Sequence, residues 1–373
     1  MTTAATHEAV GRRIEELDTP ALFVDLDALE ANASMMAGAC RANGIDWRPH
    51  VKASKAPELA KRLLAAGAVG VTCAKVSEAE VMADGGITDI LIANEVVGAT
   101  KIARLVALAG RARLCVAADD TRNLEELSAA ATAAGVNLDV LVDVDVGMGR
   151  CGVTPEEAPA LAQRVLDLPG LSLRGLMGYE GHVQGIRDLE EKEARSEESA
   201  SMLAEAKRLV EAVGIPVECT SGGGTGNYWI ASTLGALTEL QAGGGVLMDQ
   251  TYGLYGVPGH RQALFLEIQV ISAPRLGQAI GDAGWKASGR HTGLPAVWDS
   301  DLAQLDSSIE VTGLSAEHTH LRLAEGVTLE PGQRLLLVPH YSDSTVLLHR
   351  TMYAVRNGVV EDVWPISGAG MLQ

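Results

Sequence analysis

Aromatic and basic residues are scarce in this chain of 373 residues. Phenylalanine, tryptophan and tyrosine make up 3% of it, and 30 lysines and arginines face 48 aspartates and glutamates, which gives a formal net charge of −18. A nucleic acid or an anionic membrane surface would repel such a chain, and no basic run of useful length offsets the charge. We therefore expect a small-molecule partner, and neither a nucleic acid nor a membrane.

Long apolar runs and a regular cysteine pattern are missing as well. No window reaches the roughly 18 apolar residues of a membrane span, and residues 1–18 hold no apolar segment of signal-peptide length. The five cysteines are odd in number, widely spaced and mostly inside apolar runs: Cys40, Cys73, Cys115, Cys151 and Cys219. This pattern favours reduced, buried thiols over a disulfide framework or a zinc site, and so indicates a cytoplasmic protein.

Hydrophobic residues, in contrast, make up 47% of the chain, enough for one large core or two moderate ones. From residue 20 onward, short β-rich apolar runs alternate with helical stretches, the pattern of a parallel sheet. The expected strands are residues 21–26, 46–52, 69–74, 89–94, 112–118, 138–144, 173–179, 217–222 and 239–243, and the clearest helices are 57–66, 121–134, 156–168 and 188–213. Eight or nine strands with long helices between them favour an α/β fold of the (β/α)8 TIM-type barrel class over a doubly wound sheet.

After about residue 252 the rhythm changes to strand-like alternation with few helix formers and frequent Gly and Pro. The expected strands there are residues 263–270, 308–312, 334–339, 351–356 and 359–364. We assign residues 19–255 to the barrel and residues 256–373, joined by 1–18, to a β domain that contributes to the active site.

A lysine at the end of the second expected strand is the first candidate for chemistry. Lys52 follows an apolar run and has Arg48 and Lys55 as cationic neighbours, which lower the preference of its amine for the charged form. A neutral amine attacks aldehydes, and this chemistry suits a Schiff base with pyridoxal phosphate. The alternative is a pair of solvated lysines at a helix start, which the local sequence alone favours.

Two glycine-rich runs follow late strands. They are Ser221-Gly222-Gly223-Gly224-Thr225-Gly226 and Gln241-Ala242-Gly243-Gly244-Gly245. Consecutive glycines let backbone N–H groups converge on an anion, and the late strands of a barrel are a frequent phosphate site. Neither run has the spacing of a Walker loop or of a dinucleotide fingerprint. A cofactor with a single phosphate is therefore expected, and a pair of flexible connectors is the alternative.

Motifs along nearly the whole chain resemble the fold-type III pyridoxal-phosphate enzymes, within them the group of D-threonine aldolases, D-3-hydroxyaspartate aldolases and D-serine dehydratases. The matching stretches include residues 48–52, 74–80, 93–96, 149–152, 221–226 and 239–243. The resemblance implies an internal aldimine on Lys52, with Arg150 near the phenolic oxygen of the cofactor and Tyr179 near its ring. It places Ser221, Gly223, Gly224, Thr225, Gly243 and Gly244 around the phosphate and Gln241 at the pyridine nitrogen. We add His50 to the cofactor contacts, with a hydrogen bond at a helix start as its alternative role.

The chain departs from this family where the aldolases hold a divalent metal. Asp343 matches one metal ligand of the family, but Tyr341 stands where the ligand histidine is expected. His340 can substitute only through a local bulge, because neighbouring strand residues point to opposite faces. If a metal is bound, we expect Mn²⁺ or Mg²⁺ on Asp343 and His340.

If no metal is bound, two histidines are candidates for the base that takes the substrate's hydroxyl proton. A family histidine after the glutamine matched by Gln184 is replaced by Gly185, so we assign that role to His182. His318, in the pair Glu317-His318, resembles a family pair that faces the substrate pocket from the β domain.

The resemblance implies an aldolase that cleaves D-3-hydroxy-amino acids to glycine and an aldehyde. The alternative is a D-serine-type dehydratase with the same fold and cofactor; a racemase and a non-catalytic pyridoxal-phosphate carrier are weaker alternatives. We expect a cytoplasmic homodimer acting on an amino-acid substrate.

Overall fold

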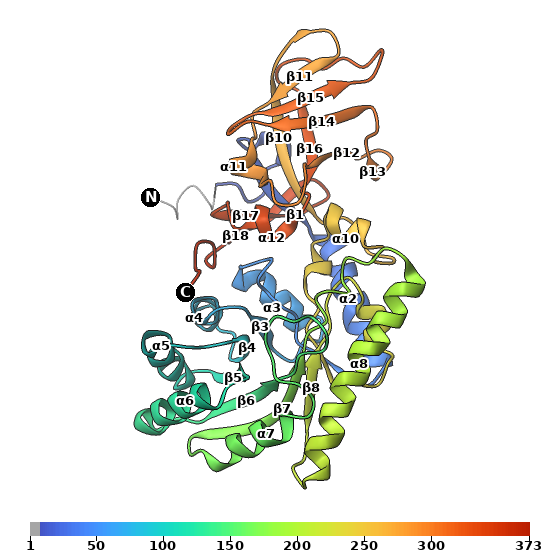
Figure 1. Ribbon diagram of the computed structural model, residues 1–373. Helices are drawn as coiled ribbons and strands as arrows, with labels where there is room; N and C mark the ends of the chain where they lie inside the picture. Colours follow the sequence, from blue (N-terminus) through green and yellow to red (C-terminus); the bar gives the residue numbers. More distant parts are fainter. Residues whose placement is uncertain (1–7) are drawn as a thin grey trace.

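Two sheets make up the structure, a computed structural model that describes residues 8–373 (Figure 1). One of them has eight parallel strands in the order β2-β9-β8-β7-β6-β5-β4-β3. The strands are β2 (Asp46–Trp47), β3 (Val71–Cys73), β4 (Asp89–Glu95), β5 (Arg113–Ala118), β6 (Leu138–Asp143), β7 (Leu171–Gly178), β8 (Cys219–Gly222) and β9 (Glu239–Leu240). Each of these eight lies within or beside a strand predicted from the sequence.

Backbone hydrogen bonds join the two end strands of that order and close the sheet. The Val69 N–H donates to the Trp47 carbonyl at 2.9 Å, and the Thr72 N–H donates to the Pro49 carbonyl at 2.9 Å. In the other direction, the Val51 N–H donates to the Thr72 carbonyl at 2.8 Å. With this junction the sheet is an eight-stranded barrel, which confirms the predicted fold class.

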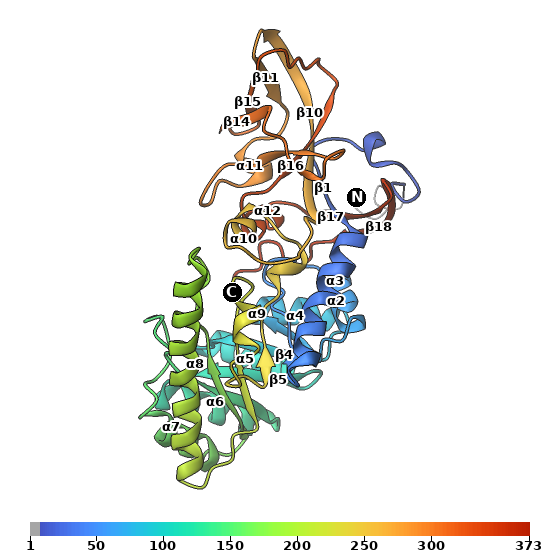
Figure 2. The ribbon, with the colours of Figure 1, turned by 90° about the vertical axis from the view of Figure 1, so that its right-hand side faces the viewer.

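Helices surround the barrel, as Figures 1 and 2 show. They are α2 (Leu26–Ala42), α3 (Pro57–Ala65), α4 (Val76–Asp84), α5 (Ala99–Ala109), α6 (Thr121–Ala134), α7 (Ala158–Asp167), α8 (Leu189–Ala212) and the short α9 (Tyr228–Ala231). The side chains of Asp120 and Asp188 cap α6 and α8 by accepting hydrogen bonds from backbone N–H groups of the first turn. After β9 come a 3₁₀ turn η2 (Gly244–Val246) and α10 (Gln250–Leu254), which lead into the second sheet.

The second sheet has ten strands and forms the β domain. They are β1 (Ala21–Asp25), β10 (Leu264–Arg275), β11 (Gln278–Gly281), β12 (Ala296–Asp299), β13 (Gln304–Leu305), β14 (Ile309–Leu314), β15 (Thr319–Leu323), β16 (Arg334–Val338), β17 (Thr351–Arg356) and β18 (Val359–Pro365). Two short helices, α11 (Trp285–Ser288) and α12 (Ser342–Val346), lie in its connections. The five strands predicted for this region are β10, β14, β16, β17 and β18.

Strand β1 corrects one assignment made from the sequence, which placed it in the barrel. Phe23 pairs antiparallel with Phe265 of β10 and parallel with Tyr353 of β17, so β1 lies inside the second sheet. A buried apolar run of five residues fits either sheet, and its composition does not reveal which strands it will pair with. Without β1 the barrel keeps its eight strands.

The segment before β1 also lies against the β domain. The Gly11 N–H donates to the Val360 carbonyl at 2.9 Å, and the Ile14 N–H donates to the Gly358 carbonyl at 2.9 Å. A 3₁₀ turn, η1 (Ile14–Glu16), follows this contact. Of the predicted N-terminal contribution to the β domain, residues 1–7 lie outside the described part of the chain.

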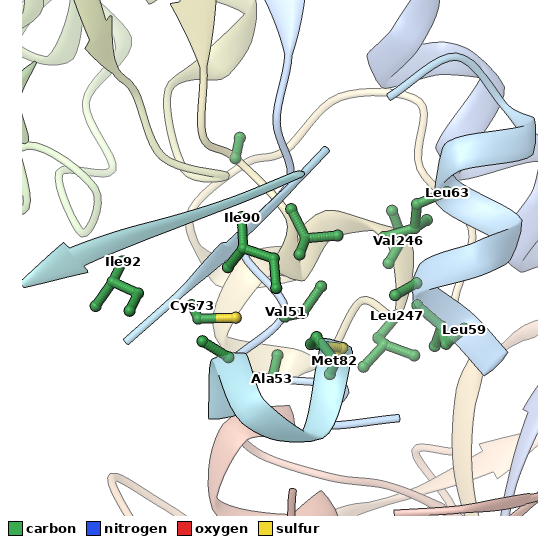
Figure 3. Packing of buried hydrophobic residues seen from close by; sticks show 14 of the residues in the cluster. Val51, Ala53, Leu59, Leu63, Cys73, Met82, Ile90, Ile92, Val246 and Leu247 are labelled. Carbon is green, nitrogen blue, oxygen red and sulfur yellow. The ribbon is translucent and has the colours of Figure 1, made fainter. Parts of the chain in front are cut away.

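The residues on either side of Lys52 are anchored in the barrel core. Val51 and Ala53 are buried and pack near α3 and α4, among the apolar side chains shown in Figure 3. A tight turn follows, in which the Lys55 N–H donates to the Val51 carbonyl at 2.9 Å. This anchoring fixes the backbone of Lys52 at the barrel rim.

The cysteines are not joined by disulfides, as their number and spacing predicted. All five cysteines are free thiols, and all but the half-buried Cys151 are buried. Within residues 8–373, no helix has the length and apolar character needed to cross a bilayer.

Candidate active site

A cavity of about 310 Å³ lies at the carboxyl ends of the barrel strands. Its walls bring together most of the predicted site residues, from the barrel and from the β domain: His50, Lys52, Arg150, Tyr179, Gly223, Gly224, Thr225, Gln241, Gly243, Gly244 and Asp343. Asn94, Cys151 and Tyr252 line it as well. Parallel strands of a barrel meet at this end, which is why residues far apart in the sequence converge there.

Lys52 and His50 occupy one wall. The backbone N–H of Lys52 donates to Nδ1 of His50 at 3.3 Å, so the ring proton belongs on Nε2. Burial holds the pKa of His50 well below its ordinary value, and the positive charges of Lys52, Lys55 and Arg150 lower it further. His50 is therefore a neutral imidazole beside the amine of Lys52.

The two cations expected to act on Lys52 have carboxylate partners of their own. Arg48 turns into the barrel, where Nε donates to Glu239 at 2.7 Å and Nη1 to Asp89 at 2.6 Å. Lys55 forms a buried ion pair with Glu78. Both charges are thus compensated, and the sequence argument that relied on them loses its basis.

Four backbone N–H groups in the two glycine-rich loops form an anion cradle. Those of Gly224, Thr225, Gly243 and Gly244 donate no hydrogen bond to any described residue, although all four residues line the cavity. A Cβ atom on Gly243 would lie 2.3 Å from the His50 carbonyl oxygen, so the close approach of the two loops requires glycine there. Convergent free N–H groups in a buried loop fit a phosphate, and with Lys52 in the same cavity the site fits pyridoxal phosphate.

Buried polar side chains hold the cradle from behind. The Glu180 carboxylate accepts from the Gly223 N–H at 3.3 Å and from Nδ2 of Asn227 at 2.8 Å. Nζ of Lys192 donates to the carbonyls of Gly226 and Tyr255, both at 2.6 Å. Lys192 is 1% exposed, and burial lowers its pKa to about 8. The sequence offered no signal for these supports, because a charged residue on a helix is normally read as solvated.

Arg150 and Tyr179 share another part of the wall. The guanidinium carbon of Arg150 lies 5.6 Å from the centre of the Tyr179 ring, a cation–π contact. Burial and the neighbouring Glu180 raise the pKa of Tyr179, so its hydroxyl stays protonated. Close by, burial and the charge of Glu95 raise the pKa of Asp143 to about 8.

The predicted metal pair is not brought together. Asp343 lines the cavity, where its Oδ1 is buried without a hydrogen-bond partner. His340 points elsewhere: its Nδ1 lies 2.9 Å from the Thr292 hydroxyl, and a Cβ atom on Gly293 would lie 2.2 Å from its ring. Strand β16 ends at Val338 and α12 begins at Ser342, so residues 340–343 do not continue the strand on which a bulge was expected, and His340 is not turned toward Asp343.

Tyr341 does not replace the missing histidine as a metal ligand. Burial, followed by the negative charge of Asp343, raises the pKa of its phenol, which keeps the ligand atom protonated. Burial also raises the pKa of Asp343, against the opposing effect of the Lys52 charge. One carboxylate and one protonated phenol are a poor donor set for Mn²⁺ or Mg²⁺, so the residues present do not fit the expected metal.

Three more predicted residues lie away from the cavity wall. His182 is exposed, with its ring 3.4 Å from the position of a Cβ atom on Gly147, in the connection after β6. His318 is exposed in the turn between β14 and β15, beside α11, where the Trp285 N–H donates to the Ser315 carbonyl at 3.0 Å and Lys286 pairs with Glu317. Ser221 is fully buried beneath the wall, with its hydroxyl 2.8 Å from Glu239. Ser221 lies in β8, whereas His182 and His318 lie in connecting segments, and in each case the side-chain direction depends on packing that sequence spacing does not contain. The structure therefore gives these three predictions no support.

A second chamber of about 230 Å³ adjoins Lys52. It is lined mainly by aromatic and hydroxyl side chains from both domains: Tyr179, Thr225, Thr251, Tyr252, Tyr255, His291, Thr292 and Tyr341. The ring centres of Tyr252 and Tyr341 lie 6.4 Å apart, and those of Tyr252 and Tyr255 lie 6.2 Å apart. The sequence analysis missed this chamber, although two of only six tyrosines, Tyr252 and Tyr255, closely follow the second glycine run.

Comparison with known proteins identifies the family. Residues 24–250 match the family described as alanine racemase, N-terminal domain, and residues 263–355 match the putative serine dehydratase domain. The chain is 40% identical to a D-threonine aldolase of Arthrobacter over 96% of its own length and 95% of the relative's. It is 38% identical to a 3-hydroxy-D-aspartate aldolase of Paracoccus denitrificans, covering 95% and 93% of the two chains.

A solved structure agrees with these sequences. The crystal structure of D-threonine aldolase from Filomicrobium marinum superposes with a TM-score of 0.93 at 37% identity, covering 98% of this chain and 99% of that one. A D-threo-3-hydroxyaspartate dehydratase of Delftia is 30% identical over 88% of this chain and 92% of its own. The chain therefore belongs to the alanine racemase-like family of pyridoxal-phosphate enzymes that includes D-threonine aldolase and 3-hydroxy-D-aspartate aldolase.

Proposed function

We propose that this protein is an aldolase that cleaves D-3-hydroxy-amino acids to glycine and an aldehyde with pyridoxal phosphate as cofactor. The observation that carries the proposal is one cavity that joins a lysine amine, a cradle of free backbone N–H groups and a carboxylate oxygen without a partner. These belong to Lys52, to the loops at 224–225 and 243–244, and to Asp343. The D-threonine aldolases similar to this chain share its whole length.

The barrel residues hold the cofactor in this proposal. The N–H groups of the two glycine loops bind its phosphate, and the amine of Lys52 is the nucleophile for its aldehyde. Arg150 and Tyr179 lie on the adjoining wall. His50, which also lines the cavity, contributes an uncharged imidazole ring. Bound pyridoxal phosphate supplies the electron sink that takes the electron pair of the breaking Cα–Cβ bond.

Asp343 takes the hydroxyl proton. When the Cα–Cβ bond breaks, the β-hydroxyl carbon becomes the carbonyl of the aldehyde, so the hydroxyl must lose its proton while Cα gains one. Asp343 is the carboxylate on the cavity wall, and its buried Oδ1 has no hydrogen-bond partner that would have to be displaced. This assignment replaces the predicted roles of His182 and His318, which lie outside the cavity.

The second chamber receives the substrate side chain and favours an uncharged one. Its described lining contains no arginine, and its lysine is Lys52, which the cofactor occupies. A β-carboxylate such as that of 3-hydroxyaspartate would lie among phenol and hydroxyl groups and the imidazole of His291, without an arginine or a free lysine as its partner, which is unfavourable for a buried charge. Aromatic or alkyl side chains gain from contact with Tyr252, Tyr255 and Tyr341.

A dehydratase is the second candidate, because the 30% identical Delftia relative is named D-threo-3-hydroxyaspartate dehydratase. In that reaction, the substrate bound in the same cavity would lose its α-proton and then its β-hydroxyl group. Incubating the purified protein with D-threonine, D-phenylserine and D-serine separates the two. We expect glycine and an aldehyde from the first two; an oxoacid and ammonia would show a dehydratase, and no turnover of any of them would refute both.

We further propose that the enzyme acts as a homodimer in the cytoplasm on free amino acids, without a nucleic-acid partner. The free state of all five cysteines and the net charge of −18 support this setting.

A further inference from the structure

A buried relay of polar side chains lies beneath the cavity wall at Gln241. The Glu239 carboxylate, 1% exposed, accepts two hydrogen bonds on Oε2, from Nε of Arg48 and from Nη2 of Arg174, both at 2.7 Å. Its other oxygen, Oε1, lies 2.8 Å from the Ser221 hydroxyl. That hydroxyl in turn lies 3.0 Å from Nε2 of Gln241, the residue that lines the cavity.

The charges at the far end of the relay fix which groups donate. Burial is the largest single effect on the pKa of Arg48 and of Arg174 and lowers it, but the charge of Glu239 together with the smaller effects of other neighbours raises both, so the two guanidinium groups are charged. A carboxylate held between two guanidinium groups is ionised and can only accept hydrogen bonds. The Ser221 hydroxyl must therefore donate its single proton to Glu239.

This leaves the Ser221 oxygen as an acceptor toward Gln241. Of the two ends of the Gln241 amide, only the NH₂ group can donate to it, so the amide cannot be reversed without placing two oxygens against each other. The amide oxygen, Oε1, accepts no hydrogen bond from any described residue. It is the end of the amide that remains for a ligand in the cavity.

We propose that the relay from Arg48 and Arg174 through Glu239 and Ser221 holds Gln241 with its carbonyl oxygen toward the cofactor, which keeps the ring nitrogen of the cofactor protonated. An acceptor oxygen opposite the ring nitrogen forms a hydrogen bond only if that nitrogen carries a proton. Gln241 touches the cofactor, whereas Ser221 and Glu239 are positioning residues. A protonated ring withdraws more electron density from the breaking bond. The inference rests on the proposed function for its cofactor.

The test is the ¹⁵N NMR spectrum of the protein loaded with pyridoxal phosphate labelled with ¹⁵N in the ring. We expect the wild-type protein to show the shift and one-bond N–H coupling of a pyridinium. Gln241→Glu keeps an acceptor and should retain that signal. Gln241→Leu removes the acceptor, and Ser221→Ala frees the amide to turn, so both signals should move toward that of an unprotonated pyridine.

Ser232→Ala is the matched control, because it removes a buried hydroxyl that has no hydrogen-bond partner and should leave the signal in place. An unprotonated ring in the wild-type protein would overturn the proposal, whether or not the variants fold. A pyridinium signal unchanged in both Ser221→Ala and Gln241→Leu would also overturn it. Product analysis on the same wild-type sample tests the aldolase proposal separately, since ring protonation can be read without turnover.

Discussion

At the scale of single residues, the proposed chemistry depends on two side chains of opposite charge. Lys52 comes from the barrel rim and Asp343 from α12, and both line the same cavity. The positive charge of Lys52 lowers the pKa of Asp343 against the larger opposite effect of burial. A carboxylate in this position can exchange a proton with a bound substrate at low cost, because its free oxygen has no other partner.

Replacing this carboxylate should damage catalysis and spare cofactor binding. We expect Asp343→Asn to lower kcat by about 10²- to 10⁴-fold, the usual contribution of a positioned proton acceptor. Bound cofactor, read from its absorbance, should be unchanged because the cradle is untouched. Asp301→Asn, on an exposed loop of the same domain, is the control. A kcat for Asp343→Asn within a few-fold of the wild-type value would remove Asp343 from the chemistry.

Chelation should leave the activity intact. Tyr341 offers a protonated phenol and His340 is held at Thr292, so a divalent ion at the position predicted for the metal would find Asp343 alone. We expect full turnover after exhaustive EDTA treatment and dialysis, and metal-free protein by elemental analysis. Conversely, Tyr341→His places an imidazole beside Asp343 and should create measurable Mn²⁺ binding. If EDTA treatment abolished the activity of the wild-type protein and added Mn²⁺ restored it, the account would be contradicted.

At the scale of secondary structure, the site is held by helix caps and loop supports. The buried carboxylate of Asp249 accepts from the Tyr252 N–H at 2.9 Å and from the Ser342 N–H at 2.7 Å. It therefore caps α10, which carries Tyr252, and α12, which carries Asp343, and burial raises its pKa to about 6. One side chain thus sets the position of two elements of the cavity wall.

The elements predictable from the sequence are those whose signal is local. Helix α6 spans the predicted residues 121–134, because Asp120 caps its start and Gly135 adopts φ 66° at its end. The two glycine loops were predictable, because a loop in which several backbone N–H groups converge on one anion needs glycine at most of its positions. Strand β1 was misplaced and His340 misdirected, because strand partners and side-chain directions depend on tertiary contacts that no local pattern encodes.

Helix α8 carries the buried amine of Lys192, and the free-energy cost of burying its charge should depend on pH. The pKa of Lys192, about 8 in the folded protein, lies below the ordinary value of 10.5. The unfolded chain therefore binds more protons between pH 8 and 10.5, and folding stability should rise with pH in that window. We expect the wild-type protein to gain about 2 kcal/mol relative to Lys192→Met between pH 7.5 and 9.5. Urea unfolding of both proteins measures this; a difference that stays flat or falls over that range would refute the shifted pKa.

At the scale of the whole molecule, the cavity depends on the contact between the barrel and the β domain. Figure 2 shows the β domain above one end of the barrel, with α10 and α12 close to their junction. The N–H groups of Gln250 and Thr251 donate to the carbonyls of Pro339 and His340 at 3.2 and 3.0 Å, which joins the two parts. In the proposed function, the barrel supplies the cofactor site and the β domain closes the substrate chamber.

Substrate selectivity tests this shared chamber. We expect kcat/KM for D-phenylserine to exceed that for D-threo-3-hydroxyaspartate by at least about tenfold, because the buried β-carboxylate would lack an arginine or a free lysine as its partner. Thr292→Arg adds a cation to the chamber wall and should narrow the ratio, whereas Thr312→Arg, on β14 and outside the chamber, should not. A wild-type preference for the acidic substrate would show that the chamber has been misassigned.

The most direct test of the account is to locate the cofactor on the chain. Borohydride reduction of the protein loaded with pyridoxal phosphate, followed by fragment-ion sequencing of its peptides, identifies the lysine that carries the pyridoxyl group. We predict the label on Lys52, whose amine lines the cavity beside the phosphate cradle. A label on Lys55 or Lys192, both buried in contacts of their own, or no label at all, would contradict the proposed active site.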